Sequence, residues 1–470
     1  MTAFAPEKEK QNLRTSAEPA GETSCPPGCT GCSTIDEEGI IHRIPFTKEM
    51  KETYRILVPN MLPMHFEMIC KIFDHYGYTS EVLTDGSHGD SRTVIDKGLK
   101  YVHNDTCYPA LLIIGQFLTA LDSGRYDTHK VALLLSQTGG GCRASNYIPL
   151  LRKALIKAGY GYIPVISFNL AGLEENPGFK LTLPILHRMA YGMIYADLIM
   201  LLRNQCKPYE LHAGDSDRMA DKWTEILTNE MAEAKVIRYG RVKKNYVRVL
   251  DAFASIPMQP RDAVKVGVVG EIYIKFSPLG NNNLEEFLNA EGAEVVKGGL
   301  VDFCIFCVYN GIMDNRLYGL HRRTGWVYRL IYRFLCKKQM DLIRTIRRHG
   351  RFAPPPYFDH MKDLVQGVIG YGAKMGEGWL LTAELLDHIE SGIENVVCVQ
   401  PFGCLPNHIV GKGKMRQVKE AHPEANVIAV DYDPSATRIN QENRLKLMLA
   451  NAKKTPVRGN TFVTGKPEKR

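Results

Sequence analysis

The sequence predicts an α/β protein with two doubly wound parallel-sheet lobes joined by helices. Apolar strand-like runs alternate with stretches of helical period, and this alternation occurs in two series separated by a mainly helical stretch. A chain of 470 residues is also too long for a single compact core. Its content of 44% hydrophobic and 23% charged residues is that of an ordinary globular protein.

The first lobe is expected at residues 46–185. Its predicted strands are apolar runs bounded by Gly, Pro or polar residues, at 53–61, 79–83, 130–137 and 163–169. The run KVALLLSQ (130–137) is apolar throughout, as in a strand buried on both faces. The predicted helices show amphipathic spacing, at 65–77, 110–124 and 143–159.

A helical connector is expected at residues 186–260, and the second lobe at 261–455. The strand-like runs of this lobe lie at 264–274, 293–306, 395–402 and 425–433. Its helical stretches lie at 281–292, 362–392 and 435–454. A basic helical insertion, 315–352, ends at the proline run of 353–357, which no helix can cross. The polar segments 1–45 and 456–470 are expected to be flexible tails.

The positive charge of the chain is concentrated in the insertion. Between Arg316 and Arg351 eleven Lys or Arg residues stand against one Asp, whereas the whole chain has a net charge of +8. Aromatic residues such as Trp326 are interleaved with these charges. The alternatives for this face are a solvated amphipathic surface, docking of a protein, docking on a membrane, and binding of nucleic acid or of a ligand's phosphate groups. No nucleic-acid-binding module surrounds the insertion, so we do not expect nucleic acid.

The expected location is cytoplasmic, without a membrane partner. The first residues lack the apolar core of a signal peptide. The longest apolar run, 191–202, is short and contains Asp197, so we do not expect it to span a bilayer. Disulfides are disfavoured in that compartment, so metal ligation or thiol chemistry is the better explanation for twelve cysteines. Cys70 and Cys206 lie in helical contexts where simple burial suffices.

The stretch LLLSQTGGGCRASNY (133–147) runs from a strand through three glycines to Cys142. A phosphate loop, a nucleophilic thiol and an iron–sulfur cluster are all compatible with accessible backbone N–H groups at the start of a helix. The P-loop and dinucleotide-binding patterns are absent here, and no catalytic partner for a nucleophile can be argued. Cys107 and Cys404 also lie at predicted carboxyl ends of strands or at helix starts, where open parallel sheets bind ligands.

Four stretches resemble the 2-hydroxyacyl-CoA dehydratase family, closest to its branch of activase-related and double-cubane cluster proteins. They are HNDTCYPALLIIGQ (103–116), SQTGGGCRASNYIPLLRKAL (136–155), QPFGCLPNHIVGKG (400–413) and DYDPSATRINQENRLKLMLANAKK (431–454). The resemblance covers roughly residues 45–455. It implies an iron–sulfur cluster in the cleft between the lobes, held by Cys107, Cys142 and Cys404.

The same resemblance implies a function and partners. A separate ATP-hydrolysing iron–sulfur activator would donate low-potential electrons. The chain would use them for radical dehydration of a 2-hydroxyacyl-CoA or for reduction of a small molecule, as a homo- or heterodimer. A non-catalytic electron relay or accessory subunit is the alternative. Gly139, Gly140 and Gly141 would allow the main chain to approach the cluster closely, and Arg143 would offset the negative charge of the cluster.

Further cysteines leave the type of cofactor open between a 4Fe–4S cluster and an 8Fe–9S double cubane. A second subcluster would use Cys304, Cys307 and Cys398. The N-terminal CPPGCTGC carries Cys25, Cys29 and Cys32, for which two alternatives stay open: an auxiliary iron–sulfur or zinc site, and a redox-active or idle tail. Its C-x3-C-x2-C spacing is that of radical S-adenosylmethionine proteins, but Gly31 stands where they carry an aromatic residue. Glu377 and His408 are candidate proton donors near the cysteines.

Overall fold

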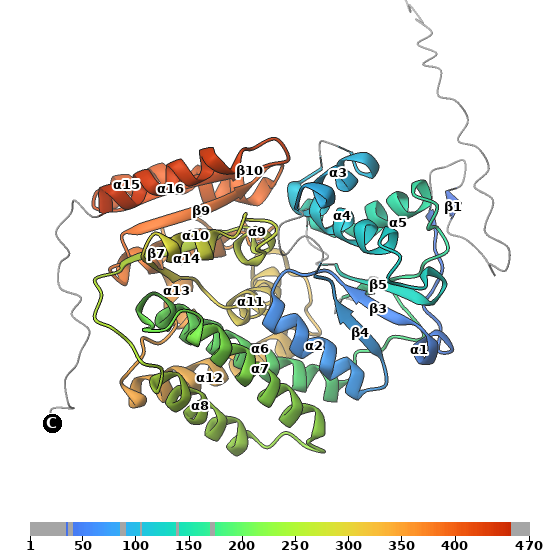
Figure 1. Cartoon of the computed structure of the whole chain (residues 1–470), viewed down its shortest axis with the longest axis horizontal. Helices are drawn as coiled ribbons and strands as arrows, with labels where there is room; N and C mark the ends of the chain where they lie inside the picture. Colours follow the sequence, from blue (N-terminus) through green and yellow to red (C-terminus); the bar gives the residue numbers. More distant parts are fainter. Residues whose placement is uncertain are drawn as a thin grey trace, which may run out of the picture.

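The computed structural model describes residues 34–35, 41–84, 91–103, 106–137, 141–169 and 174–452. Two four-stranded parallel sheets with helices against them confirm the predicted α/β class. Figure 1 shows the first lobe in blue to teal beside the second lobe in yellow to red. A short antiparallel pair, β1 (Thr34–Ile35) and β2 (Ile41–His42), and the four-residue helix α1 (Met50–Thr53) precede the first sheet.

The first sheet has the strand order β4-β3-β5-β6. Its strands are β3 (Arg55–Val58), β4 (Thr79–Val82), β5 (Val131–Ser136) and β6 (Val165–Phe168). Side chains alternate between its faces: Ile56 and Val58 pack in the core that contains α2 (Pro63–His75), whereas Leu57 packs in the other core. That second core contains α3 (Ser91–Tyr101), α4 (Tyr108–Asp122) and α5 (Tyr147–Lys157).

The second sheet has the strand order β10-β9-β7-β8. Its strands are β7 (Val264–Gly270), β8 (Ala293–Val296), β9 (Asn395–Pro401) and β10 (Asn426–Tyr432). Its flanking helices are α9 (Ile272–Phe276), α10 (Leu284–Ala290), α14 (Trp379–Glu390), α15 (Met415–Ala421) and α16 (Arg438–Ala452). If each sheet's strands are numbered in chain order, both sheets read 2-1-3-4 from one edge, so the lobes share a topology.

The helices not yet named form a separate layer that runs along both lobes (Figure 1). They are α6 (Leu183–Cys206), α7 (Asp215–Glu233), α8 (Tyr239–Ala254), α11 (Leu300–Tyr318), α12 (Gly325–His349) and the short α13 (Phe358–Asp363). The segment Leu183–Tyr209 is long and apolar enough to cross a membrane, yet 67% of its most apolar window is buried inside the protein. It is therefore a core helix in this structure.

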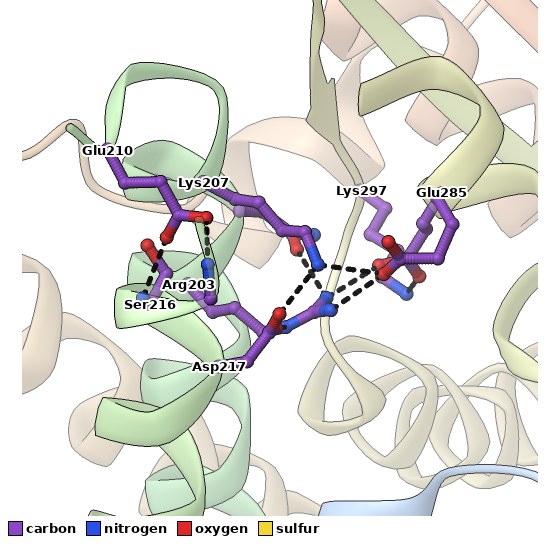
Figure 2. Close-up of polar contacts among 10 residues, drawn as sticks. Arg203, Lys207, Glu210, Ser216, Asp217, Glu285 and Lys297 are labelled. Atoms are coloured by element: carbon purple, nitrogen blue, oxygen red, sulfur yellow. Dashed lines mark hydrogen bonds and ion pairs between the residues drawn. The ribbon is translucent and has the colours of Figure 1, made fainter. Parts of the chain in front are cut away.

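An ion-pair network joins this helical layer to the second lobe (Figure 2). The Arg203 guanidinium on α6 lies 2.6 Å from Asp217 on α7, and 3.0 and 3.4 Å from Glu286 and Glu285 on α10. The Lys297 ammonium, after β8, pairs with Glu285 as well. Because one guanidinium serves three carboxylates from two parts of the chain, the network holds α6 in a defined position against α10.

Three predictions of secondary structure were wrong in part. The stretch 264–274 was expected to be a strand, but β7 ends at Gly270 and α9 begins at Ile272. The stretch 293–306 was expected to be strand-like, but only Ala293–Val296 is a strand, and α11 begins at Leu300. The Asp197 carboxylate on α6 accepts the backbone N–H groups of Leu300 and Val301, at 2.8 and 2.9 Å, and so supplies a cap from outside the segment. The stretch 362–392 was expected to be helical, whereas a loop separates α13 from α14.

Candidate functional site

The two sheets present equivalent ligand-binding positions. In a doubly wound sheet this position lies at the carboxyl ends of the strands where the strand order reverses. That point falls between β3 and β5 in the first sheet and between β7 and β9 in the second. The loops that follow β5, β7 and β9 contain Cys142, Glu271 and Cys404, respectively.

Cys107, Cys142 and Cys404 come together at these loops. Cys107 is the residue before α4, and Cys142 precedes a short 3-10 helix that leads into α5. The thiol of Cys107 interacts electrostatically with both Cys142 and Cys404. The Tyr108 backbone N–H donates to the Phe402 carbonyl at 2.9 Å, which joins the Cys107 segment to the loop after β9. Cys107 and Cys404 are buried, whereas Cys142 is half-buried.

Two glycines allow these loops to approach closely. A Cβ atom on Gly403, whose φ is +69°, would lie 3.1 Å from the Cys107 Cα atom. A Cβ atom on Gly376, with φ +59°, would lie 2.8 Å from Pro406 and 3.8 Å from the Cys142 Sγ atom. Both glycines have a left-handed backbone, and the loops can approach this closely only because glycine has no side chain. The loop before α14 therefore lies between the Cys142 and Cys404 segments.

Of the polar groups around the three cysteines, Tyr147 and Glu271 were missed from the sequence, whereas Arg143 and Glu377 were predicted. The Tyr147 hydroxyl lies 3.0 Å from the Cys107 Sγ atom, and burial raises the pKa of Tyr147. A Cβ atom on Gly403 would also be 3.4 Å from a guanidinium nitrogen of Arg143, so this cation stands beside the Cys404 loop. Tyr147 follows Cys142 by five residues at the start of α5, and only the folded loop directs it to Cys107.

A pair of buried carboxyl groups faces the same cysteines. Glu271 follows β7, and its Oε2 atom accepts the Ile274 N–H at 2.9 Å. Glu377 accepts the Ile272 N–H at 3.0 Å, so both side chains serve the first turn of α9. Burial, and then repulsion from Glu377, raise the pKa of Glu271 to about 8. Burial raises the pKa of Glu377 as well. Both carboxyls interact with Cys142 and Cys404.

The thiols share this desolvated environment. Burial raises the pKa of Cys107 to about 11, and it raises the pKa values of Cys142 and Cys404. Because a thiolate is the form that binds metals, these groups need a bound cation to lose their protons near neutral pH. Among the residues the structure describes, no group of three or more His, Cys, Asp or Glu side chains is arranged to hold a single metal ion.

Of the cysteines suggested for a second subcluster, Cys304 and Cys307 interact with each other on α11, whereas Cys398 packs in a different core cluster. Cys398 is 1% exposed on β9, packs in the core next to α14 and α15, and its Sγ atom lies 3.4 Å from Asn407 Oδ1. Cys304 and Cys307 lie on α11, and the Cys304 Sγ atom is 3.8 Å from the Met193 sulfur. Cys307 is exposed, although the surrounding protein desolvates its thiol and raises its pKa, and it interacts with Glu377.

The remaining predicted residues are either outside the described part of the chain or in the positions given below. Cys25, Cys29, Cys32, Gly139 and Gly140 lie outside the described residues. Gly141 is exposed, and its N–H donates to the Met375 sulfur at 3.0 Å. His408 is exposed. Cys70 and Cys206 are buried at 4% and 0% exposure, as expected of packing residues.

The fold and these contacts define an α/β protein of two parallel sheets with a cysteine-rich site between their switch points. No protein-family model and no curated protein sequence matches this chain. The assignment to a family therefore remains an expectation from the residues themselves.

Proposed function

We propose that this chain is an iron–sulfur protein that uses low-potential electrons from an ATP-hydrolysing iron–sulfur activator. The reaction would be radical dehydration of a 2-hydroxyacyl-CoA or reduction of a small molecule. Cys107, Cys142 and Cys404 would hold the cluster. The observation that carries the proposal is the approach of these three cysteines, which lie as much as 297 positions apart, at the switch points of two sheets.

The set of donors suits such a cluster. Thiolates are soft ligands that favour iron–sulfur clusters over hard oxygen-seeking cations. A cluster of several irons keeps its cysteine sulfurs farther apart than a single ion does, so a site can suit a cluster without suiting one ion. When bound, the group would supply one-electron transfer and an iron that lacks a cysteine ligand.

The chain's own residues would then have separable tasks. The Tyr147 hydroxyl would donate to the Cys107 sulfur, and hydrogen bonds to sulfur tune reduction potentials. Arg143 would offset negative charge beside the Cys404 loop. Burial and the neighbouring Glu377 raise the pKa of Glu271, which favours its protonated form near neutral pH. Its Oε2 atom accepts a backbone hydrogen bond, so the proton would reside on Oε1, ready for a leaving hydroxyl or a reduced product.

The alternative is a cluster-bearing electron relay without a substrate. A relay would favour a site sealed by side chains. Cys142 is only half-buried and Cys307 is exposed, and both interact with Glu377. Solvent therefore reaches this side of the cysteine site, which supports the version of the proposal that includes a small-molecule substrate.

The test is anaerobic purification followed by iron and sulfide quantification and EPR spectroscopy. We expect about four irons per chain for a single cube and about eight for a double cubane. Cys142→Ala should lose most of the iron. The matched control is Cys206→Ala, which removes a buried free cysteine at the end of α6 and should leave the iron content unchanged. Equal iron in both variants, or none in the wild type, would refute the proposal.

Cys398→Ala distinguishes the two cofactors. Its thiol lies in the core six positions before Cys404, so a single cluster predicts unchanged iron. Halved iron in Cys398→Ala, together with the same loss in Cys307→Ala, would instead support the double cubane.

A further inference from the structure

Seven large apolar side chains are exposed between the end of α11 and the middle of α12. We call this surface the α11–α12 patch; its apolar members are Leu317, Tyr318, Leu320, Trp326, Leu330, Ile331 and Phe334. Trp326 and Leu330 are 61% and 60% exposed. Trp326, Leu330 and Phe334 follow one another at intervals of four, so they lie on one side of the helix. Single exposed apolar residues are ordinary, but a concentration of seven in 18 positions indicates an interaction surface.

The charged residues of the patch are all of one sign. Five exposed arginines, Arg316, Arg322, Arg323, Arg329 and Arg333, accompany the apolar side chains, and no acidic residue occurs from 315 to 334. In the described part of the chain, none of these arginines forms an ion pair. The nearest preceding acid, Asp314, is paired with Lys374.

The patch is a preformed surface. The opposite side of α12 is packed into the protein, where Leu335, Leu342, Ile343 and Ile346 are buried. Tyr328 lies against α11 so closely that a Cβ atom on Gly311 would be 2.5 Å from its ring. α12 therefore has its own tertiary support, and the exposed side needs no partner in order to fold.

The charge pattern discriminates between occupants. Across a two-fold axis, a second copy of the chain would bring ten like charges together, which is unfavourable. A specific protein partner is usually recognised by charges of both signs, and the patch offers positive charge alone, with no carboxylate from 315 to 334. A lipid surface requires only apolar depth and opposite charge.

We propose that the α11–α12 patch binds the surface of an anionic lipid bilayer. Trp326, Leu330 and Phe334 enter the interfacial region, and the arginines extend toward the lipid phosphates. The protein lies on the membrane and does not cross it. This inference is independent of the proposed function, and it replaces the expectation that the chain has no membrane partner.

Trp326 is a native reporter for the test. The other two tryptophans, Trp223 and Trp379, are 7% and 0% exposed, so a change of solvent contact falls on Trp326. The full chain is mixed with vesicles of phosphatidylcholine alone or with phosphatidylglycerol added. We expect cosedimentation and a blue shift of emission only with the anionic vesicles, weakened by salt. Trp326→Phe should lose the shift and still cosediment.

Charge reversal tests whether the patch itself is responsible. Arg322→Glu/Arg323→Glu/Arg329→Glu should weaken binding at least about 100-fold, because each arginine near an anionic surface contributes roughly fivefold. The matched control Arg92→Glu/Arg416→Glu/Arg438→Glu changes the net charge equally at exposed positions elsewhere and should bind within a few-fold of the wild type.

Two results would overturn the proposal. Equal losses in the two triple variants would mean that total charge, and not the patch, drives binding. A wild type that leaves both kinds of vesicle unbound at low ionic strength would exclude a lipid surface. An acidic protein would then be the remaining occupant of the patch.

Discussion

The buried ion pair between Lys275 and Glu384 offers a sharp test of how the second lobe is held together. The Lys275 ammonium on α9 lies 2.9 and 3.1 Å from the two carboxylate oxygens of Glu384 on α14, and the side chains are 6% and 4% exposed. At 2.9 Å and an effective dielectric constant near 20, the attraction is about 6 kcal/mol before desolvation is subtracted. Asp302 and Glu377 also interact with Glu384, so this carboxylate has acidic neighbours.

Lys275→Met should therefore destabilise the protein by about 3–5 kcal/mol, since it leaves the Glu384 carboxylate buried without its cation. Lys275→Met/Glu384→Met removes both charges and should recover most of that loss. The assay is urea denaturation followed by circular dichroism and tryptophan emission. Arg416→Met, which breaks an exposed pair with Glu420, is the control and should cost about 0.5 kcal/mol or less.

Two outcomes would contradict this reasoning. One is a loss below about 1 kcal/mol in Lys275→Met, which would mean that Glu384 finds other compensation. The other is a double variant whose loss of stability equals the sum of the losses in Lys275→Met and Glu384→Met measured separately, which would show that the two charges do not interact.

Three further variants test other parts of the fold. Burial lowers the pKa of His388 from 6.5 to about 4, so its contribution to stability is present above pH 6.5 and is lost as the pH falls through 4. The free energy of unfolding, measured by urea titration, should fall between pH 7 and pH 4 by on the order of 3 kcal/mol less in His388→Gln than in the wild type. An equal fall in both proteins would contradict this. Gly403→Ala would place an alanine in a left-handed backbone, with its Cβ atom 3.1 Å from the Cys107 Cα atom. We expect the free energy of unfolding to fall by about 1–2 kcal/mol and the iron content to fall as well. If neither value changed, the close approach of the two loops would be refuted. Gly115→Ala would place a methyl group 2.1 Å from the Val94 carbonyl oxygen and should separate α3 from α4, measured as a loss of at least about 1 kcal/mol in thermal unfolding; a neutral result would be inconsistent with this packing.

The local pattern of the chain was sufficient for most of the sheet. The apolar run at 130–137 became β5, and the amphipathic stretch at 110–124 became α4, because the period of burial along the chain reflects the geometry of each element. The placement of Cys142 and Cys404 after β5 and β9 could likewise be predicted, since strand ends are visible from composition.

Contacts between distant segments escaped prediction. The start of α11 depends on the Asp197 carboxylate, which is 103 positions away from Leu300. Nothing in the sequence near Glu271 indicates that Glu377 will join it at the first turn of α9. The sequence left a solvated face and several docking surfaces open for the segment around Trp326, and only the tertiary structure shows which of its apolar side chains are exposed.

The sequence by itself determined where strands and helices alternate and which cysteines stand at their ends, because these properties depend on neighbours a few positions apart. The tertiary structure alone decided which carboxyls, tyrosines and glycines surround the cysteines and which helix face stays uncovered. Those outcomes depend on packing between segments up to hundreds of positions apart, where charge, burial and steric fit act across space and leave no periodic trace in the chain.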